Sequence, residues 1–254
     1  MKREDRRQAI VNLLIENQTV DLDDLADRFA VSKMTIHRDL DSLEQSGVLR
    51  KVRGGATIDT GSQLESDFRF REQQDGEAKH KMARAALQLV RPGMSVMVND
   101  GSMAAVFGGM LLEKRPLTVI TNNAAIIDEL KGQSGINLIA LGGTYSVKLN
   151  AFLGILTEEA LSHLSADIAF ISSPAVNGQL VYHMDESAAR TKRAMTASAA
   201  RSCLLVNHQR FGHPALHVIA NLSDFDAIIT DSSPSAAILD EFEQAGIKLT
   251  IAAD

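Results

Sequence analysis

Two groups of residues in this chain of 254 residues have types and spacings that suit an anionic partner. The first group lies between positions 32 and 53 and mixes cations with hydroxyl and imidazole groups. Such side chains donate hydrogen bonds to phosphates and to the edges of DNA bases. Its members, which we predict to contact double-stranded DNA, are Ser32, Lys33, Thr35, His37, Arg38, Arg50, Lys51 and Arg53.

The second group consists mostly of small polar residues that follow apolar runs after position 93. Backbone N–H groups and the hydroxyl of the Asp100-Gly101-Ser102 loop could bind a phosphate, while the Asp100 carboxylate suits sugar hydroxyls. Lys192 and Arg210 are candidate phosphate partners. Plain turns and solvated charges are the alternatives. The predicted effector-binding residues are Asn99, Asp100, Gly101, Ser102, Thr121, Asn122, Gly142, Gly143, Lys192 and Arg210.

Metal and thiol chemistry are not indicated. Cys203 is the only cysteine, which rules out an internal disulfide and a cysteine-based zinc site. Because it lies in an apolar run, we predict a buried, inert thiol. The spacings of the histidines at 183, 208, 213 and 217 do not combine a pair on one helical turn with a third ligand. We therefore predict no metal, no cofactor and no catalytic residue.

The charges are unevenly distributed along the chain. The net charge is −6 at pH 7, yet residues 1–55 carry ten basic and ten acidic residues, so the excess acid lies in the remainder. Within residues 1–55 the acids gather at positions 21–27 and most of the cations follow. A modest local basic face suits site-specific DNA binding with limited non-specific affinity.

The length and hydropathy of the chain indicate a globular protein without a membrane span. Hydrophobic residues make up 45% and charged residues 23% of the chain, as in ordinary globular proteins, and the length favours two domains. No apolar stretch approaches the roughly 18 residues of a membrane span. The charged N-terminus does not fit a signal peptide. We expect a cytoplasmic protein.

Three helices are predicted to position the first group. A helix over residues 6–16 precedes a second helix that Asp21 caps, and Ser32 caps a third. Two short helices joined by a brief turn, the second with a basic exposed face, form a helix-turn-helix. The apolar stripe of the third helix, at helical spacing, consists of Ile36, Leu40 and Leu43.

A basic hairpin is predicted to follow the third helix, which ends at Gly47. Strands over residues 48–52 and 56–58 enclose the turn Arg53-Gly54-Gly55. Such a β-wing could reach flanking phosphates or the minor groove, and a solvated basic loop is the alternative. Residues 1–58 thus form a predicted DNA-binding domain. A linker over 59–75 follows, in which Phe68 and Phe70 are candidate anchors to one of the domains.

Alternating strand and helix patterns are predicted to position the second group, within a domain at 76–254. Strand–helix repetition implies parallel strands with crossover helices, and ligands bind beyond the carboxyl ends of such strands. Most of the predicted effector-binding residues follow those ends. The strand-like runs cover residues 94–98, 117–120, 136–141, 168–171, 202–206 and 227–230.

The order and spacing of the N-terminal residues carry a family resemblance. Arg7, Val11 and Ile15 precede Ser32-x-x-Thr35-Ile36-His37-Arg38-Asp39-Leu40, which leads into Leu43-Glu44-x-x-Gly47-x-Leu49-x-x-Val52-x-Gly54-Gly55-Ala56. This pattern resembles the N-terminal signature of DeoR-family bacterial repressors. His37 stands where many members have arginine, and an imidazole gains and loses its charge near neutral pH.

The later part of the chain resembles the sensor domain of the same family. The matching residues are Asp100-Gly101-Ser102, Thr121-Asn122, Gly142-Gly143, Gly154, Asp167-x-Ala169-Phe170 and Asp231. The resemblance implies a domain similar to ribose-5-phosphate isomerase that binds phosphorylated sugars or related metabolites. The expected fold is therefore an α+β winged helix-turn-helix domain followed by an α/β, Rossmann-like, largely parallel-sheet sensor domain.

Three departures from the family pattern affect the predicted ligand. Met103-Ala104 replaces two threonines, and Asn207-His208-Gln209-Arg210-Phe211-Gly212 stands where Asp-x-Ser-Lys-Phe-Gly is usual. The Ser172-Ser173-Pro174-Ala175 turn replaces a glycine-rich version. These changes leave open an effector without a phosphate.

These observations together predict a ligand-responsive DNA-binding repressor of a carbohydrate-metabolism operon, released by a sugar or sugar phosphate. We expect a homo-oligomer, a dimer or tetramer, because one short helix reads too few base pairs to be specific alone. A module that docks on protein partners through its N-terminal helices is one alternative.

A sugar-phosphate isomerase fused to a DNA-binding module is the other alternative. Aldose–ketose isomerisation needs a carboxylate base beside a polarising cation, and Asp100, Asp167 and Asp185-Glu186 are available with Lys192. However, Ser172-Ser173-Pro174 stands after Phe170, where the related isomerase is expected to have a dense acidic loop. We therefore expect no enzyme activity.

Overall fold

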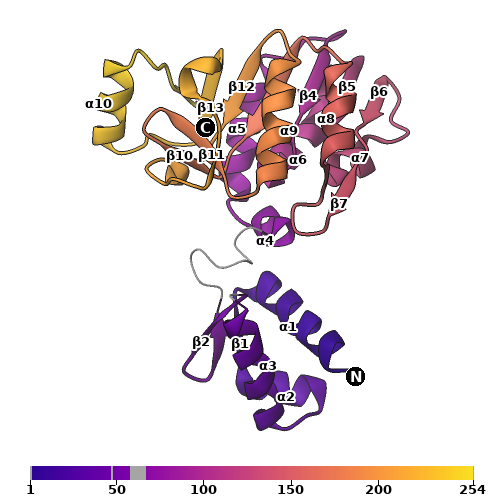
Figure 1. The fold of residues 1–254 in the computed structure, drawn as a ribbon, viewed down its shortest axis with the longest axis vertical. Coiled ribbons are helices and arrows are strands. Elements are labelled where there is room, and N and C mark those ends of the chain that lie inside the picture. Colours follow the sequence, from indigo (N-terminus) through magenta and orange to yellow (C-terminus); the bar gives the residue numbers. More distant parts are fainter. Residues whose placement is uncertain (1, 47, 58–66, 254) are drawn as a thin grey trace. The chain divides into compact units, whose positions relative to one another are not determined.

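The chain folds into two compact units, residues 1–74 and 75–254, in the computed structural model (Figure 1). The structure describes residues 2–46, 48–57 and 67–253. We call the two parts the N-terminal unit and the C-terminal unit. None of the described helices is long and apolar enough to cross a membrane.

The N-terminal unit consists of helices packed with a small antiparallel sheet. Successive turns of its first three helices bury apolar side chains such as Ile10, Leu14 and Leu40 in one core. The sheet has the strand order β1-β3-β2, so its first strand and the hairpin pair with each other. The elements are α1 (Arg3–Asn17), β1 (Thr19–Asp21), α2 (Leu22–Phe29), α3 (Lys33–Gln45), β2 (Arg50–Val52) and β3 (Gly55–Thr57).

The predicted helix-turn-helix and wing are confirmed. Asp21 accepts the Asp23 N–H at 2.7 Å at the start of α2, and the Ser32 hydroxyl accepts the Thr35 N–H at 3.2 Å at the start of α3. Gly55 lets β3 approach β1, because a Cβ there would lie 1.9 Å from the Val20 carbonyl oxygen. The predicted helix end at Gly47 and strand end at Ile58 lie outside the described residues.

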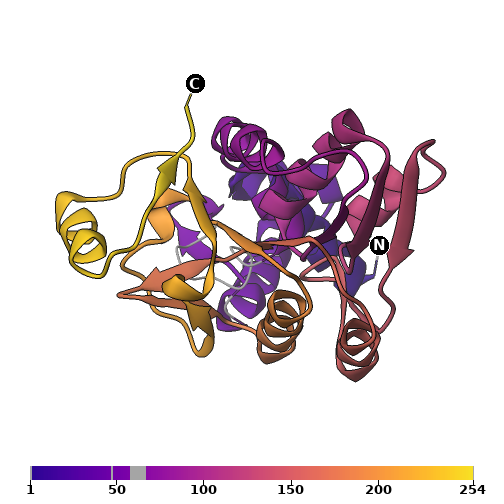
Figure 2. The same cartoon turned by 90° about the horizontal axis from the view of Figure 1, so that it is seen from above.

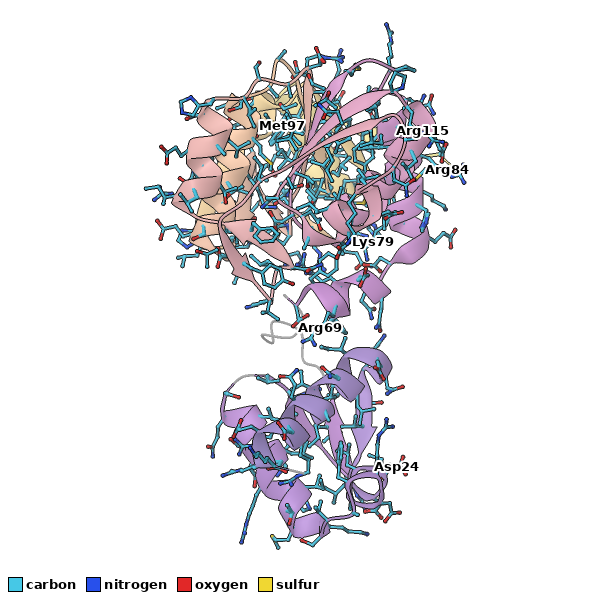
Figure 3. The ribbon with its side chains drawn as sticks, turned by 90° about the vertical axis from the view of Figure 1, so that its right-hand side faces the viewer. Asp24, Arg69, Lys79, Arg84, Met97 and Arg115 are labelled. Atoms are coloured by element: carbon cyan, nitrogen blue, oxygen red, sulfur yellow. The ribbon has the colours of Figure 1, made fainter. Side chains whose placement is uncertain are left out.

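A short helix, α4 (Phe68–Gln73), occupies part of the range 59–75 that the sequence predicts as linker. Arg69, labelled in Figure 3, donates a hydrogen bond to Asn12 of α1 at 3.0 Å. Phe70 packs against the core of the N-terminal unit. Six residues are too few to show an apolar period, which explains why the helix escaped prediction. The segment belongs to the N-terminal unit, while residues 58–66 lie outside the described residues.

A seven-stranded parallel sheet forms the centre of the C-terminal unit, in the order β15-β14-β12-β9-β4-β5-β6. All the predicted strands are present, which confirms the α/β fold. The edge strand β15 was not predicted, because two residues carry no pattern. The strands are β4 (Ser95–Val98), β5 (Leu117–Thr121), β6 (Ile136–Ala140), β9 (Ile168–Ser172), β12 (Ser202–Leu205), β14 (Ala227–Thr230) and β15 (Thr250–Ile251).

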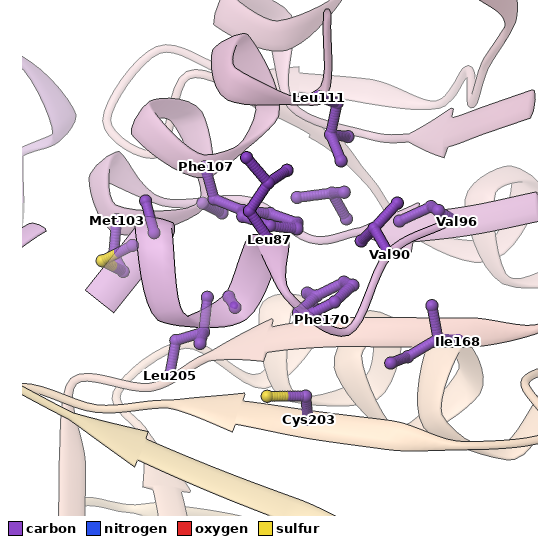
Figure 4. Packing of buried hydrophobic residues seen from close by; sticks show 14 of the residues in the cluster. Leu87, Val90, Val96, Met103, Phe107, Leu111, Ile168, Phe170, Cys203 and Leu205 are labelled. Carbon is purple, nitrogen blue, oxygen red and sulfur yellow. The ribbon is translucent and has the colours of Figure 1, made fainter. Parts of the chain in front are cut away.

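Helices cover both faces of this sheet (Figure 2). Successive strand residues alternate between two cores: Val96 and Phe170 contribute to one, and Met97 to the other. In the first core the rings of Phe107 and Phe170 lie 4.2 Å apart, centroid to centroid (Figure 4). The helices are α5 (Gly76–Leu87), α6 (Ser102–Met110), α7 (Ala124–Leu130), α8 (Ile155–Ser162), α9 (Glu186–Ala197) and α10 (Ala236–Gln244).

Two further antiparallel sheets were not predicted from the sequence. One pairs β10-β11-β13 and the other is the hairpin β7-β8. Their short strands lack the length over which alternation can be recognised. They are β7 (Thr144–Ser146), β8 (Ala151–Leu153), β10 (Ala175–Asn177), β11 (Leu180–His183) and β13 (His217–Asn221).

Candidate nucleic-acid interface and effector site

Helix α3 has an apolar side that faces the core and a polar side that faces solvent. Ile36 and Leu40 are fully buried, whereas His37 and Arg38 are exposed. The cap at Ser32 and the apolar stripe together fix which side of the helix points outward. The predicted DNA-contacting side chains His37 and Arg38 are therefore accessible to a partner.

Lys33, also predicted to contact DNA, already has an ionic partner. Its ammonium lies 2.7 Å from the Asp23 carboxylate of α2, and both side chains are exposed. The hydrogen bond and the charge of Asp23 raise the pKa of the Lys33 amine. A DNA phosphate at this position would have to compete with Asp23.

Some of the wing cations face solvent, and one, like Lys33, already has an ionic partner. Arg50 and Arg53 are exposed. Lys51 is half-buried, and its ammonium pairs with Asp41 of α3 while its backbone N–H donates to Glu44 at 2.8 Å. Lys51 thus ties the wing to α3, a role that the sequence did not reveal.

The buried carboxylate of Asp39 on α3 was not predicted from the sequence. Asp39 is only 1% exposed, and its carboxylate accepts a hydrogen bond from Arg6 Nε at 2.6 Å. Arg7 Nε lies 3.4 Å and Arg3 Nε 3.6 Å from the same carboxylate. Asp39 therefore joins α3 to α1. Asp39 lies within the apolar side of α3, between Ile36 and Leu43, and this position could have predicted its burial.

Most of the predicted effector residues lie at the carboxyl edge of the large sheet, at or after the ends of β4, β5, β6 and β12. Asn99 and Asp100 follow β4 and are at most 1% exposed. Lys192 arrives from α9 and places its ammonium 2.8 Å from Asp100 Oδ1, with both side chains buried. The structure thus brings together two predicted residues that are 92 positions apart.

The Lys192 side chain points into the protein because of the way helix α9 is capped and packed. Asp185 caps the helix by accepting the Ala188 N–H at 2.9 Å. Ala188, Ala189 and Met195 face inward, and Lys192 lies one turn from each of them, so its side chain is carried into the interior.

Amide side chains hold the ends of the central strands together. Asn99 Oδ1 accepts the Ser172 N–H at 2.9 Å, which connects the ends of β4 and β9. Asn123 Nδ2 donates to the Gly101 carbonyl at 3.1 Å, and the Thr121 hydroxyl donates to the Val98 carbonyl at 2.7 Å. Ser172 and Asn123 were not among the predicted site residues, although both stand at the end of a predicted strand.

Helix α6 starts at this edge with no side-chain cap. Its N-cap, Gly101, has a φ of 111°, a conformation that favours glycine. The first N–H groups of a helix have no partner within the helix and can bind an anion. Met103 and Ala104, which replace two threonines of the family pattern, are buried in the adjacent core.

Buried oxygens without a hydrogen-bond partner in the described part of the chain include Asn122 Oδ1, at the end of β5, and Thr191 Oγ1, on α9. Both residues are fully buried. Asn122 Nδ2 donates to the Phe152 carbonyl at 3.0 Å, so this hydrogen bond already fixes the orientation of the side-chain amide. Buried polar atoms usually find a partner, and a ligand hydroxyl is one that could fill this role.

The remaining predicted residues lie farther along the same edge. Gly142 accepts a hydrogen bond from Thr157 Oγ1 at 2.6 Å, and a Cβ on Gly143 would lie 2.4 Å from that oxygen. The absence of a side chain at Gly143 therefore leaves room for Thr157 of α8, whereas a Cβ on Gly142 would meet no atom within 4 Å. Arg210 lies in the short 3₁₀ helix that follows β12, which is two strands from β4 in the sheet order.

A histidine–carboxylate pair occupies the edge beside β12 and β14. His208 Nδ1 lies 2.8 Å from Asp231 Oδ2, and the His208 N–H donates to Asp231 Oδ1 at 2.7 Å. Across the described residues, no group of three or more histidine, cysteine, aspartate and glutamate side chains could hold a metal ion.

Two family models match the chain, one for each unit. The DeoR-like helix-turn-helix domain matches residues 6–61, and the DeoR C-terminal sensor domain matches residues 74–232. The second match alone covers more than half of the chain. Together the two models reproduce the order of the units described above.

Several curated proteins are similar over most of their length. The glycerol-3-phosphate regulon repressor of Escherichia coli (strain K12) is 25% identical over 253 residues, 99% of this chain and 100% of that protein. The repressor GlcR of Bacillus subtilis (strain 168) is 28% identical, covering 99% and 97%. The L-fucose operon activator of Haemophilus influenzae is 32% identical over 212 residues, covering 83% and 84%.

The solved structures that the chain resembles are less similar in sequence than these curated proteins. A ribose 5-phosphate isomerase A from Methanocaldococcus jannaschii has a TM-score of 0.40 and 18% identity, covering 54% of this chain and 55% of that one. The chain thus spans about half the length of the isomerase that it matches. A likeness of this degree does not indicate a shared activity.

Proposed function

This chain belongs to the DeoR family of DNA-binding transcriptional regulators, and we propose that it represses a carbohydrate-metabolism operon until a sugar or sugar-phosphate effector binds. The observation that carries the proposal is the joining, in one chain, of a winged helix-turn-helix unit to an α/β unit with polar residues gathered at the carboxyl edge of its sheet.

The DNA-binding surface consists of the outward side of α3 and the tip of the wing. His37 and Arg38 are exposed on α3, and Arg50 and Arg53 are exposed on the wing. In a helix-turn-helix the N-terminal part of the second helix reads base edges in the major groove. Cations on a flanking wing contribute phosphate contacts that add affinity without specificity.

The effector binds where α6 begins, beside the buried Asp100–Lys192 pair. An anionic group of the effector lies against the uncapped N–H groups of α6, next to the Lys192 ammonium, which is 2.8 Å from Asp100. Sugar hydroxyls donate to buried oxygens such as Asn122 Oδ1. Binding that favours one arrangement of the protein then weakens DNA binding through the coupling of the two sites.

Operator recognition takes at least two copies of the chain. One recognition helix contacts too few base pairs to select a site among the many competing sequences of a genome. A symmetric dimer doubles the contacts and reads two half-sites. The C-terminal unit provides the oligomerisation surface in this proposal.

No catalytic role is proposed for the carboxyl edge of the sheet. The carboxylate of Asp100, which follows β4, lies 2.8 Å from the Lys192 ammonium inside the protein. Ser172 ends β9 and Ser173 follows it, and neither is acidic. An isomerase needs a carboxylate that can take a proton from the substrate, and turnover of a pentose phosphate that Asp100→Ala abolishes would refute this view.

Two measurements with the full chain test the proposal. Fluorescence anisotropy with DNA from upstream of the chain's own gene should detect a sequence-specific complex at moderate salt, and its absence would refute the DNA-binding part. A thermal-shift screen of sugar phosphates and free sugars should find a compound that stabilises the C-terminal unit by mass action. The same compound must then weaken the DNA complex. If every stabilising compound leaves DNA binding unchanged, the regulatory part of the proposal is wrong.

A further inference from the structure

Met34, in the first turn of α3, is an apolar side chain that the fold leaves in solvent. It is 62% exposed, although neighbouring Ile36 is fully buried. In the described part of the N-terminal unit, the only other exposed large apolar side chain is Val52, at 42%. Met34 is also absent from the core cluster of this unit. Folding of the unit therefore does not explain a methionine at this position.

Met34 shares its side of α3 with two predicted DNA-contacting residues. His37 and Arg38 follow it at i+3 and i+4, a spacing that places all three on one face of a helix. All three are exposed, and Ile36 and Leu40 lie on the opposite, buried side. The surface that faces DNA thus combines one apolar side chain with two hydrogen-bond donors.

The neighbours of Met34 in the same turn are engaged within the protein. The Lys33 ammonium lies 2.7 Å from Asp23, and the hydroxyls of Ser32 and Thr35 lie 3.0 Å apart. Met34 itself, with a long side chain and no polar partner to satisfy, is left to extend from the helix. At 62% exposure, most of the Met34 surface is open to a partner.

The major groove of DNA offers one apolar group, the C5-methyl of thymine. A methionine side chain is flexible and polarisable, so it adapts to such a contact. We propose that Met34 is a specificity-determining residue that contacts a thymine methyl in each operator half-site. The proposal rests on the proposed function, since it requires that α3 lies in the major groove.

The position of this thymine can also be inferred. Four residues along a helix, from Met34 to Arg38, correspond to about 6 Å at a rise of 1.5 Å per residue. Successive base pairs are separated by about 3.4 Å. The thymine therefore lies within about two base pairs of the position at which Arg38→Ala changes base preference.

Removal of single methyl groups from the DNA tests the proposal. Operator sites are selected from a random DNA pool with the full-length protein, and each thymine is then replaced by deoxyuracil, which lacks only the methyl. Burial of one methyl-sized group corresponds to a change in affinity of about fourfold. The wild-type chain should lose about that factor at one thymine per half-site. Met34→Ala should bind the thymine and uracil forms of that site equally.

Met184→Ala is a matched control. Met184 is also 62% exposed but lies in the C-terminal unit, so this variant should keep the wild-type preference for thymine. Met34→Ala should fold normally, because alanine favours helix and the core loses no contact; circular dichroism and thermal unfolding check this.

The outcomes separate the inference from the function on which it rests. If the wild-type chain binds a selected site and no thymine-to-uracil change weakens binding, Met34 does not read a methyl group. The same conclusion follows if Met34→Ala retains the wild-type thymine preference, or if it weakens random and selected DNA equally. If no sequence is selected from the pool, the proposed DNA-binding function fails and the inference fails with it.

Discussion

Arg6 of α1 donates a hydrogen bond of 2.6 Å to Asp39 of α3, and both side chains are buried. The pair joins residues 33 positions apart and attaches the recognition helix to the first helix from the inside. Asp39 therefore belongs to the support of the recognition helix, while its neighbour Arg38 is exposed on the outside. Consecutive residues of one motif thus have separate roles.

Asp39→Asn is expected to destabilise the N-terminal unit by about 3 kcal/mol, because removal of one partner leaves a buried charge uncompensated. Chemical denaturation of the full chain, followed by circular dichroism, measures the change. Asp41→Asn is the control on the same helix, since its pair with Lys51 is partly exposed and is worth less than about 1 kcal/mol. Equal losses in the two variants would contradict the assigned role of Asp39.

Arg38→Ala is expected to weaken operator binding by roughly tenfold or more, because a base or phosphate contact of an arginine is lost. Lys33→Ala should cost less, since Lys33 must first give up its ion pair with Asp23. Asp23→Ala releases Lys33 and should strengthen DNA binding. Anisotropy titrations measure all three variants. A larger loss for Lys33→Ala than for Arg38→Ala would show that Asp23 does not restrain Lys33.

The buried Asp100–Lys192 pair is expected to behave as one unit. Lys192→Met should cost the C-terminal unit about 3 kcal/mol by leaving Asp100 charged and buried. Adding Asp100→Asn should restore part of this loss, which a double-mutant cycle measures. Lys131→Met is the surface control, because its pair with Asp128 is about 70% exposed. If the losses of the two single variants simply add, the two groups do not interact.

Acid is expected to weaken the C-terminal unit through Asp167. The Ser95 N–H and hydroxyl donate to its carboxylate at 2.7 and 2.8 Å and lower the pKa of Asp167 from its ordinary value of 3.8. A lowered pKa in the folded state contributes stability that is present above the ordinary value and is lost as the pH falls through the lowered one.

Ser95→Ala should therefore be less stable than wild type at pH 7 and closer to it in strong acid. Thermal unfolding at pH 7 and below pH 3 tests this expectation. Ser162→Ala is the control, since its hydroxyl donates to the Glu159 carbonyl and not to a carboxylate. The role of Ser95 would be refuted by a difference from wild type that is the same at both pH values.

The thiol of Cys203 is expected to be inert in the folded protein. It is fully buried, and burial raises its pKa well above the ordinary value, so the reactive thiolate is scarce. A disulfide reagent at pH 8 should label no thiol in the native chain and one per chain in urea. Fast labelling without denaturant would contradict the predicted burial.

The local features of the fold were readable from the sequence. The caps at Asp21 and Ser32, the stripe Ile36-Leu40 and the six large strands of the C-terminal unit are confirmed. Each depends on residues within a few positions of one another, through helix periodicity, strand alternation or a cap. The sequence also predicted two parts, from its length and from the loss of apolar periodicity after the wing.

Only the tertiary structure decided which charges are partners. Lys33 with Asp23, Lys51 with Asp41, and Asp100 with Lys192 each pair across different elements. The sequence presented Lys33, Lys51 and Lys192 alike, as cations available to DNA or to an effector. Which cation meets a carboxylate of the same chain depends on how helices and strands pack, and that packing is set by contacts between distant residues. The sequence determined which segments carry the DNA- and effector-binding candidates. The fold determined which of their charged groups already pair within the chain.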